Sequence, residues 1–451
     1  MTRRIADYAH DLSFEDIPAG VIAAAKTRLV DTLGCAIGGR DSDPVYISRK
    51  LAKGGAPDLY AGRIFGTRER TSAEAATFVN TCMIRYLDFN DAIHGGHPSD
   101  MSGALLALAD GAGIDGKRLL SALVVAYEVH MRLVKTTEMR ERGWDQGFAI
   151  GIGTVAGVGH LLDLSAEKIG HALAITCTGN VPMRASRAGL LSHWKGAATA
   201  YSCRNAVFAT LLAAEGMTGP DNAFEGRHGL WEQITGPFEL PAWANEGGDW
   251  FLLKSKMKYW PVEGNTLTAV WMALELRNQI KGEDIAAIDI DTHWSGWHET
   301  ASEPEKWNPT SRETADHSMP YIFARTFLDG GITVKSFEPE LVSDPLTRPL
   351  MNKIRVHNSE EINAIYKSTY PFTYVLRATV TGTDGNKFPI EVRNPRGTPQ
   401  NPMTDDEVDA KFRGLTTPVL GAERTGFALS LVRSIETAVS AAALMDAFVI
   451  E

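Results

Sequence analysis

Acidic and imidazole side chains are concentrated in residues 85–100, which read RYLDFNDAIHGGHPSD. The segment lies between two apolar stretches with helical spacing, so packing gives no reason for it to collect carboxylates and imidazoles. Such groups can remove and return protons. We expect Asp88 to hydrogen-bond His97 and so fix the tautomer of this general acid or base. The ionisable side chains of the segment are Asp88, Asp91, His94, His97 and Asp100.

Two other interpretations of this segment stay open. Ser99 or Asp100 could cap the following helix, and Asp88 could end the preceding one, which explains Asp100 better than His97. The HxxH spacing of His94 and His97 also occurs in metal sites, but it is common by chance. We therefore predict that the chain holds no metal.

Positive charge is concentrated in residues 181–200, beside a helix expected to start near Ser192. Cations next to the free N–H groups of a helix N-terminus form a site for a carboxylate. The alternative is a solvated basic face. The basic side chains are Arg184, Arg187, His193 and Lys195.

Two later segments carry further candidates. Glu263 lies in KYWPVEGNT (258–266), where the helical pattern ends. Asp316, His317 and Tyr321 begin a helix in residues 313–333. Taken alone, a histidine at such a position is more often a cap or a core residue, and that alternative stays open.

Together these residue types suit the elimination of water from a β-hydroxy acid. The reaction needs a base for the carbon-bound proton, an acid for the leaving hydroxyl, and cations for the carboxylates that hold the developing charge. The chain lacks a nucleotide-binding glycine loop in the right context, a GxSxG elbow and an HExxH motif. Nucleotide, acyl-hydrolase and zinc-protease functions therefore have no support.

Bulk composition restricts the class of protein. The 451 residues predict two or three domains, and the net charge of −10 disfavours nucleic acid as a partner. Neither a secretory signal nor an apolar span long enough for a membrane is expected. The four cysteines are scattered without metal or cluster spacing, which is typical of reduced thiols in a cytoplasmic protein.

Apolar periodicity predicts a mainly α fold with two domains. Residues 1–265 read as nearly all helix, including a helix over 99–112 and a central, fully buried one over 147–164. Residues 266–403 alternate between helices and strands, with a hairpin over 376–395, and form a smaller α+β domain. Helices at about 404–451 are expected to complete the first domain.

Several of these segments resemble, in order, motifs of the MmgE/PrpD family. The resemblance covers nearly the whole chain. The matching stretches are RLVDTLGCAIGG (28–39), LDFNDA, HPSD, LSHWKGAA, KYWPVEG, ETADHSMPYIFARTFLDGGI and NPRGTPQNPMTDDEVDAKF (394–412). The family contains 2-methylcitrate dehydratases, cis-aconitate decarboxylases and iminodisuccinate epimerases. Its fold is a large helical domain with a smaller α+β lid, usually in a homodimer, with the site between them.

The resemblance implies residue roles. The catalytic residues would be Asp88, His97, Lys195 and Tyr321; from its position we ourselves expect Tyr321 to protonate the leaving group. Substrate would be held by Asp91, Asp145, Arg184, Arg187, Glu263 and His317. No cofactor is implied, and the partner is a small polycarboxylate.

Departures from the decarboxylase branch favour a hydro-lyase of the 2-methylcitrate dehydratase type, in propionate catabolism. That branch has threonine at Ala92 and histidine at Asp145 and Glu263. The dehydratase branch in turn has tyrosine and histidine where this chain has Gly264 and Asn265, which leaves the substrate open. Epimerisation of an imino- or amino-dicarboxylate, decarboxylation and a non-catalytic binding role are the alternatives. A cytoplasmic homodimer is expected.

Overall fold

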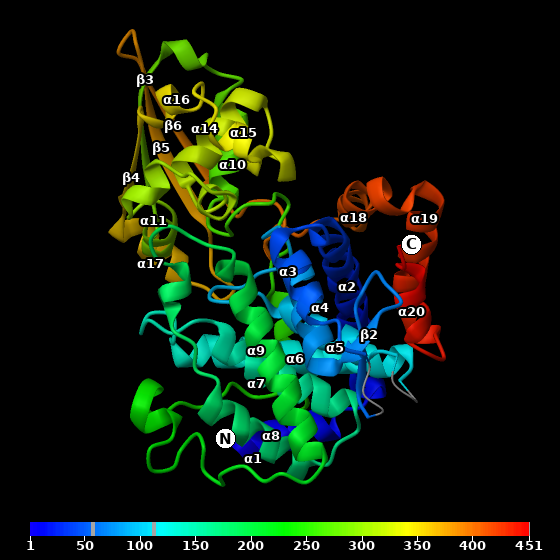
Figure 1. The fold of residues 1–451 in the computed structure, drawn as a ribbon. Coiled ribbons are helices and arrows are strands. Elements are labelled where there is room, and N and C mark those ends of the chain that lie inside the picture. Colours follow the sequence, from blue (N-terminus) through cyan, green and yellow to red (C-terminus); the bar gives the residue numbers. More distant parts are fainter. Residues whose placement is uncertain (56–58, 111–113, 451) are drawn as a thin grey trace. The chain divides into compact units, whose positions relative to one another are not determined.

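A computed structural model describes residues 1–55, 59–110 and 114–450 (Figure 1). The chain divides into two compact units. Unit 1 comprises Met1–Ser186, Gly196–Ser255 and Thr404–Glu451, and unit 2 comprises Arg187–Lys195 and Lys256–Met403. The fold is mainly helical with small sheets, which confirms the predicted class.

Unit 1 is built from helices and one short antiparallel strand pair, β1 (Ala61–Arg63) with β2 (Arg70–Ser72). In the described part of the chain its helices are α1 (Thr2–Asp11), α2 (Ala19–Gly39), α3 (Asp43–Leu51), α4 (Ala73–Arg85), α5 (Ser102–Leu108), α6 (Gly116–Thr137), α7 (Gly147–Leu161), α8 (Ala166–Gly179), α9 (Trp194–Ala214), α18 (Asp405–Leu420), α19 (Ala422–Arg433) and α20 (Ala442–Ala447). The first two residues of α9 are assigned to unit 2.

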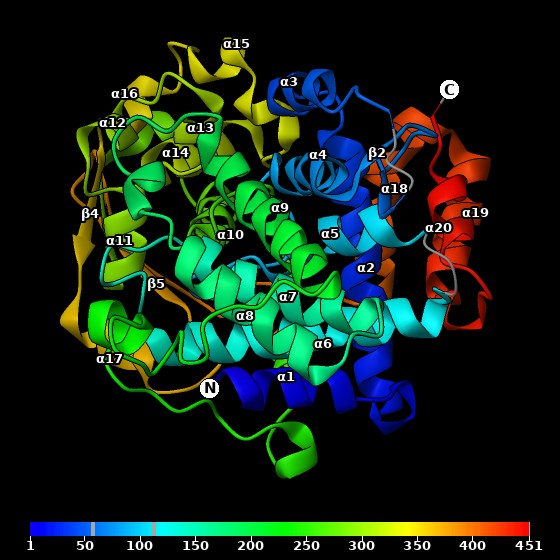
Figure 2. The ribbon, with the colours of Figure 1, turned by 60° about the horizontal axis from the view of Figure 1, so that its bottom comes forward.

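The predicted central helix over 147–164 is α7, and every one of its residues is buried. Figure 2 shows α1, α8, α7 and α6 as neighbours, and α7 contacts both α6 and α8. Close packing is possible because α7 carries glycines on these faces. A Cβ atom at Gly153 would lie 2.5 Å from Met101 Sδ and 3.0 Å from the carbonyl oxygen of Ala126.

The C-terminal helices belong to unit 1, where α18 packs on α2. Thr404 and Glu407 form a capping box at the start of α18, and Lys411 pairs with the buried Asp31 across the two helices. The apolar segment after α18 forms two helices, α19 and α20.

Unit 2 contains a four-stranded sheet in the order β4-β3-β5-β6, with β3 parallel to β4 and antiparallel to β5. The strands are β3 (Ile285–Thr292), β4 (Ile354–Asn358), β5 (Val375–Gly382) and β6 (Lys387–Arg393). The β5–β6 hairpin confirms the predicted one, and its turn uses Gly385 at φ +81°.

Two long helices, α10 (Leu267–Leu276) and α14 (Met319–Asp329), form the core of unit 2 together with the sheet (Figure 1). Most of the apolar residues of both helices are buried in this core. The other helices are α11 (Trp294–Thr300), α12 (Pro304–Trp307), α13 (Arg312–Ala315), α15 (Pro339–Val342), α16 (Arg348–Met351) and α17 (Glu360–Lys367).

Some boundaries differ from those expected. The chain passes from unit 1 to unit 2 after Ser255, ten residues before the expected boundary at 265, because KYWPVEG packs with the second core. The helix expected over 99–112 begins as a 3₁₀ turn at Pro98 and continues as α5; residues 111–113 lie outside the described chain. Among the described residues, no helix combines the length and apolarity needed to cross a bilayer.

Candidate active site

Asp88 begins the loop that follows α4. Its backbone adopts φ +49°, a left-handed conformation that aspartate tolerates better than most residues, and its amide donates to the carbonyl of Arg85. The side chain is buried, and its carboxylate accepts a hydrogen bond from the buried guanidinium of Arg85. This arginine three residues earlier offsets the cost of burying the aspartate charge.

Asp91 is fully buried in the same loop, and both of its carboxylate oxygens are engaged within unit 1. Oδ1 accepts from the amide of Ser99 at 3.1 Å, and Oδ2 accepts from the hydroxyl of Tyr127 on α6 at 2.9 Å. Burial raises the pKa of Asp91, although the bonds from Ser99 and the charge of Arg28 oppose the rise. These bonds show that Asp91 holds the loop in place, and its predicted contact with substrate stays a prediction.

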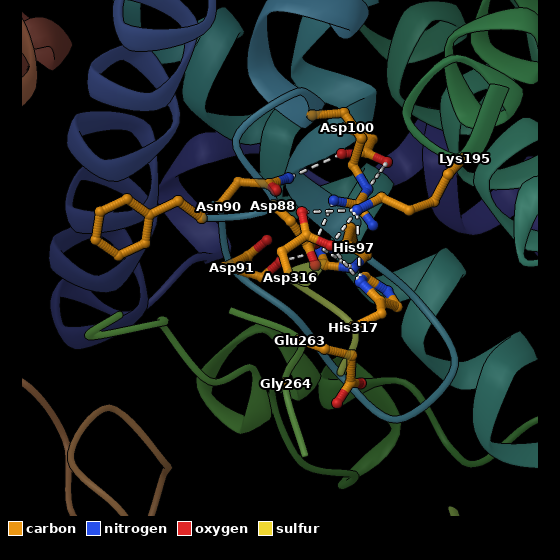
Figure 3. Close-up of polar contacts among 12 residues, drawn as sticks. Asp88, Asn90, Asp91, His97, Asp100, Lys195, Glu263, Gly264, Asp316 and His317 are labelled. Carbon is orange, nitrogen blue, oxygen red and sulfur yellow. Dashed lines mark hydrogen bonds and ion pairs between the residues drawn. The ribbon is translucent and has the colours of Figure 1, made fainter. Parts of the chain in front are cut away.

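His97 is held by the main chain of Asp91. Its Nδ1 donates to the carbonyl oxygen of Asp91 at 2.8 Å, and Nε2 lies 3.7 Å from Asp88 Oδ1 (Figure 3). A carbonyl can only accept, so Nδ1 carries the hydrogen and the neutral ring presents Nε2 as the basic nitrogen. This corrects one expectation: the tautomer is fixed by the Asp91 carbonyl, and Asp88 stands at ion-pair distance.

His94 does not join this group. Its Nε2 lies 3.1 Å from Glu141 Oε1, and its Nδ1 lies 3.2 Å from the guanidinium of Arg140. Burial pushes the pKa of Glu141 upward, but the bond and charge of His94 and the charge of Arg140 outweigh it and lower the pKa to about 2. The two histidines of the HxxH spacing thus have separate partners.

Asp145 caps the start of α7 and lies in unit 1. Its oxygens accept from the amide of Gly147 at 3.0 Å and from the hydroxyl of Ser186 at 2.8 Å. It lines, with His94, a cavity of about 30 Å³, which is room for about one water. Arg184 and Arg187 bound the next 3₁₀ turn and are half-buried, and they fall in different units. The Asp145 carboxylate thus binds the start of α7, and contact of Asp145 or of either arginine with substrate stays a prediction.

Unit 2 contributes a second ionisable group around Asp316. Lys195 donates from Nζ to both oxygens of Asp316, at 2.7 and 2.9 Å, and His317 Nδ1 lies 2.6 Å from Asp316 Oδ1 (Figure 3). The carboxylate accepts, so His317 donates from Nδ1 and presents Nε2 as its basic nitrogen. All three residues are buried. Like His97, His317 therefore has one ring nitrogen tethered.

Glu263 is joined to this group through the main chain, because its amide donates to the carbonyl of Asp316 at 2.9 Å. Its carboxylate accepts from the amide and side chain of Asn265, at 2.7 and 3.0 Å. Burial raises the pKa of Glu263, and the nearby charges of Lys256 and Lys258 oppose that rise. Glu263 thus lies among buried lysines in the segment KYWPVEG.

The next candidate is Tyr321, the predicted acid for the leaving group. It is fully buried in the core of unit 2, and its hydroxyl donates to the carbonyl of Ser336 at 2.6 Å. Burial raises the pKa of this phenol above its ordinary value. Protonating a leaving group would require the hydroxyl to give up that bond. This bond favours a structural role for Tyr321, and its role as the acid stays a prediction.

Sequence reasoning missed three residues that the structure adds to these groups: Arg85, Tyr127 and Lys258. The i, i+3 spacing of Arg85 and Asp88 was a visible signal for the first of them. Lys258 stands in the KYWPVEG segment that Glu263 marked. No sequence signal links Tyr127 to Asp91, since they meet only through the packing of α6.

Comparison with known proteins gives the family. The model of the MmgE/PrpD N-terminal domain matches residues 3–242, and that of the C-terminal domain matches residues 260–436. The chain belongs to the MmgE/PrpD family. Its relatives in that family include dehydratases and decarboxylases, and the chain is accordingly an enzyme of this family.

Three relatives illustrate the range of activities. The chain is 27% identical to alkylcitrate dehydratase phiI of a fungal species, over 90% of the chain and 86% of that protein. It is 26% identical to 2-methylcitrate dehydratase of Salmonella typhi, over 85% and 83%. It is 25% identical to human cis-aconitate decarboxylase, over 97% and 92%.

Proposed function

We propose that this MmgE/PrpD enzyme is a hydro-lyase that removes water from a small polycarboxylate resembling 2-methylcitrate. The observation that carries the proposal is the tether between His97 and Asp91, which leaves Nε2 as a base beside the buried carboxylate of Asp88. In the proposed reaction Nε2 takes the carbon-bound proton. Asp88 then stabilises the imidazolium that forms.

The acid for the leaving hydroxyl is proposed to be His317, in place of Tyr321. A protonated His317 would give up a proton from Nε2 while Asp316 holds Nδ1. Lys195 is proposed to keep Asp316 ionised and in place, because two of its three N–H donors go to that carboxylate. Both imidazoles then act as tethered rings, one as base and one as acid.

Incubation of the purified enzyme with 2-methylcitrate, citrate and isocitrate tests this proposal. Dehydration produces a carbon–carbon double bond conjugated with a carboxylate, which is followed by ultraviolet absorbance. We expect turnover of at least one of the three. Absence of any absorbance change with all three, in a protein that is folded, would count against the hydro-lyase.

An epimerase is the second candidate, and one observation favours it. An epimerisation needs a base for each face of the carbon, and His97 and His317 are two imidazoles that each have one nitrogen tethered. Such an enzyme would exchange the substrate's carbon-bound hydrogen with deuterated solvent and form no alkene. A cis-aconitate decarboxylase, the activity named in some relatives, would instead release carbon dioxide.

We also propose that the reaction needs no metal. His94 and His97 hold different partners, and the Arg140 cation beside His94 disfavours a metal ion there. Full turnover after exhaustive chelation is expected, and loss that iron or zinc restores would contradict it. The resemblance further supports a cytoplasmic homodimer, for which light scattering would give about twice the 49.1 kDa of the chain.

A further inference from the structure

Lys306 is a buried cation in unit 2 that the reaction described above does not use. Only 1% of the residue is exposed. Its nearest carboxylate oxygen is Oε2 of Glu303, 3.9 Å from the ammonium and beyond hydrogen-bond distance. Within the described ranges, no side chain or carbonyl accepts a hydrogen bond from this ammonium.

Three other lysines with little exposed side chain have close acceptors. Lys195 donates to Asp316, Lys256 donates to the carbonyl of Gly264 and the hydroxyl of Tyr374, and Lys411 pairs with Asp31. Burying an ammonium without such partners is costly, since the water lost on burial is not replaced. Burial accordingly lowers the pKa of Lys306; the charge of Glu303 opposes this shift, and the charge of Lys195 adds to it.

The backbone places Lys306 beside the Asp316–His317 pair. Ser318, the residue after His317, donates from its hydroxyl to the carbonyl of Lys306 and also caps α14. Asp316 and Lys195 lie close enough for their charges to act on the Lys306 ammonium. An anionic ligand would supply the hydrogen-bond acceptor that this cation lacks.

We propose that Lys306 binds a carboxylate group of the substrate and so contributes to the recognition of polycarboxylates. The inference rests on the proposed function, because only a substrate with several carboxylates offers one to Lys306 as well as to the reacting centre. Glu303 does not replace this ligand. Its side chain is 32% exposed, and its Oε1 already accepts from the amide of Gly189 at 3.0 Å.

Binding of tricarballylate, a tricarboxylate without a hydroxyl to eliminate, tests the assignment by calorimetry. Lys306→Met keeps an unbranched side chain, one atom shorter, and removes the charge. A hydrogen bond to a charged group predicts a Kd raised about 10- to 100-fold. Lys353→Met is the matched control, because that ammonium donates to the carbonyls of Gly282 and Ile285, at 3.2 and 2.5 Å. It should leave the Kd unchanged.

The melting temperature separates a ligand-binding lysine from a structural one. Removing a buried charge without acceptors should leave Lys306→Met as stable as the wild type or more stable, whereas Lys353→Met should be less stable. Lys306→Gln serves as a second variant. If both Lys306 variants melt lower or do not fold, the lysine is structural and the inference fails.

The affinity and turnover results decide between this inference and the hydro-lyase proposal. An unchanged Kd for tricarballylate in Lys306→Met overturns the assignment. So does a wild type that binds neither tricarballylate nor the dicarboxylate succinate. If the wild type binds tricarballylate through Lys306 yet does not dehydrate 2-methylcitrate, citrate or isocitrate, the hydro-lyase proposal fails while this inference stands. If Lys306→Met dehydrates a substrate and binds tricarballylate with the wild-type Kd, this inference fails while the hydro-lyase proposal stands.

Discussion

The Nδ1 atom of His97 donates to the main-chain carbonyl oxygen of Asp91 across 2.8 Å. The carboxylate of the same Asp91 is held by the amide of Ser99 and the hydroxyl of Tyr127. The position and tautomer of the proposed base therefore depend on a residue that itself depends on α6. A substitution at Tyr127 should therefore affect the reaction through these contacts, by way of Asp91 and His97.

Tyr127→Phe removes one of the two bonds that hold the Asp91 carboxylate. We expect kcat to fall about 10-fold, because small displacements of a catalytic group reduce the rate steeply. The ¹⁵N spectrum of His97 should show a larger share of the tautomer with hydrogen on Nε2. Tyr8→Phe, at another buried tyrosine of unit 1, is the control and should change neither. Unchanged kcat and tautomer in Tyr127→Phe would refute this link.

Tyr321→Phe distinguishes the structural role favoured by the Ser336 contact from the predicted acid role. The variant loses the bond to the Ser336 carbonyl, which should cost about 1 kcal/mol in the free energy of unfolding. Turnover should stay within about threefold of the wild type. A loss of turnover by about 100-fold or more, with the fold intact, would restore Tyr321 as the acid.

Gly153→Ala tests the packing of α7. The added methyl would meet Met101 and the backbone of Ala126, so the free energy of unfolding should fall by about 1–3 kcal/mol. Gly414→Ala is the matched control. It lies in the middle of the exposed face of α18 with no atom within 4 Å of the new methyl, and it should gain about 0.5–1 kcal/mol. Equal denaturation midpoints for the two variants would contradict the packing described.

His160 makes the stability of unit 1 depend on pH. Burial, assisted by Arg118, lowers the pKa of His160 to about 4. The unfolded chain binds this proton near pH 6.5, so stability is complete above about 6.5 and is lost as the pH falls towards 4. His160→Gln should be less stable at pH 7, because the contacts to Ser121 and Ala9 are lost.

Urea denaturation of the wild type and His160→Gln at pH 7.0 and 4.5 checks this expectation. Between the two pH values the wild type should lose up to about 3 kcal/mol more than the variant. The buried His130, whose pKa is also lowered to about 4 by burial, is present in both proteins and cancels in the comparison. An equal loss in both would show that His160 is not the titrating group.

Local patterns predicted much of the fold. The apolar glycine-rich run became the buried α7, and alternating residues became β3, β4 and the β5–β6 hairpin, because both signals depend on near neighbours in the chain. The carboxylates and imidazoles of the segment 85–100 were likewise evident from the sequence.

The contacts that organise the candidate site could not be predicted in this way. Lys195 and Asp316 are 121 positions apart, and Asp91 and Tyr127 are 36 apart, so only tertiary packing joins them. The acceptor for His97 is a main-chain carbonyl, which no residue type reveals. Tyr321 appeared catalytic by resemblance, yet its hydroxyl partner is also a carbonyl, that of Ser336.

The most direct test of the account is kcat of His97→Gln on whichever of 2-methylcitrate, citrate and isocitrate the wild type dehydrates. A general base contributes about 10²–10⁴-fold, so kcat should fall by that factor with an unchanged melting temperature. His94→Gln, in the same loop but bonded to Glu141, should retain near-normal turnover. Near-normal turnover in His97→Gln would contradict the account, and the loop at 88–100 would then be a capping structure.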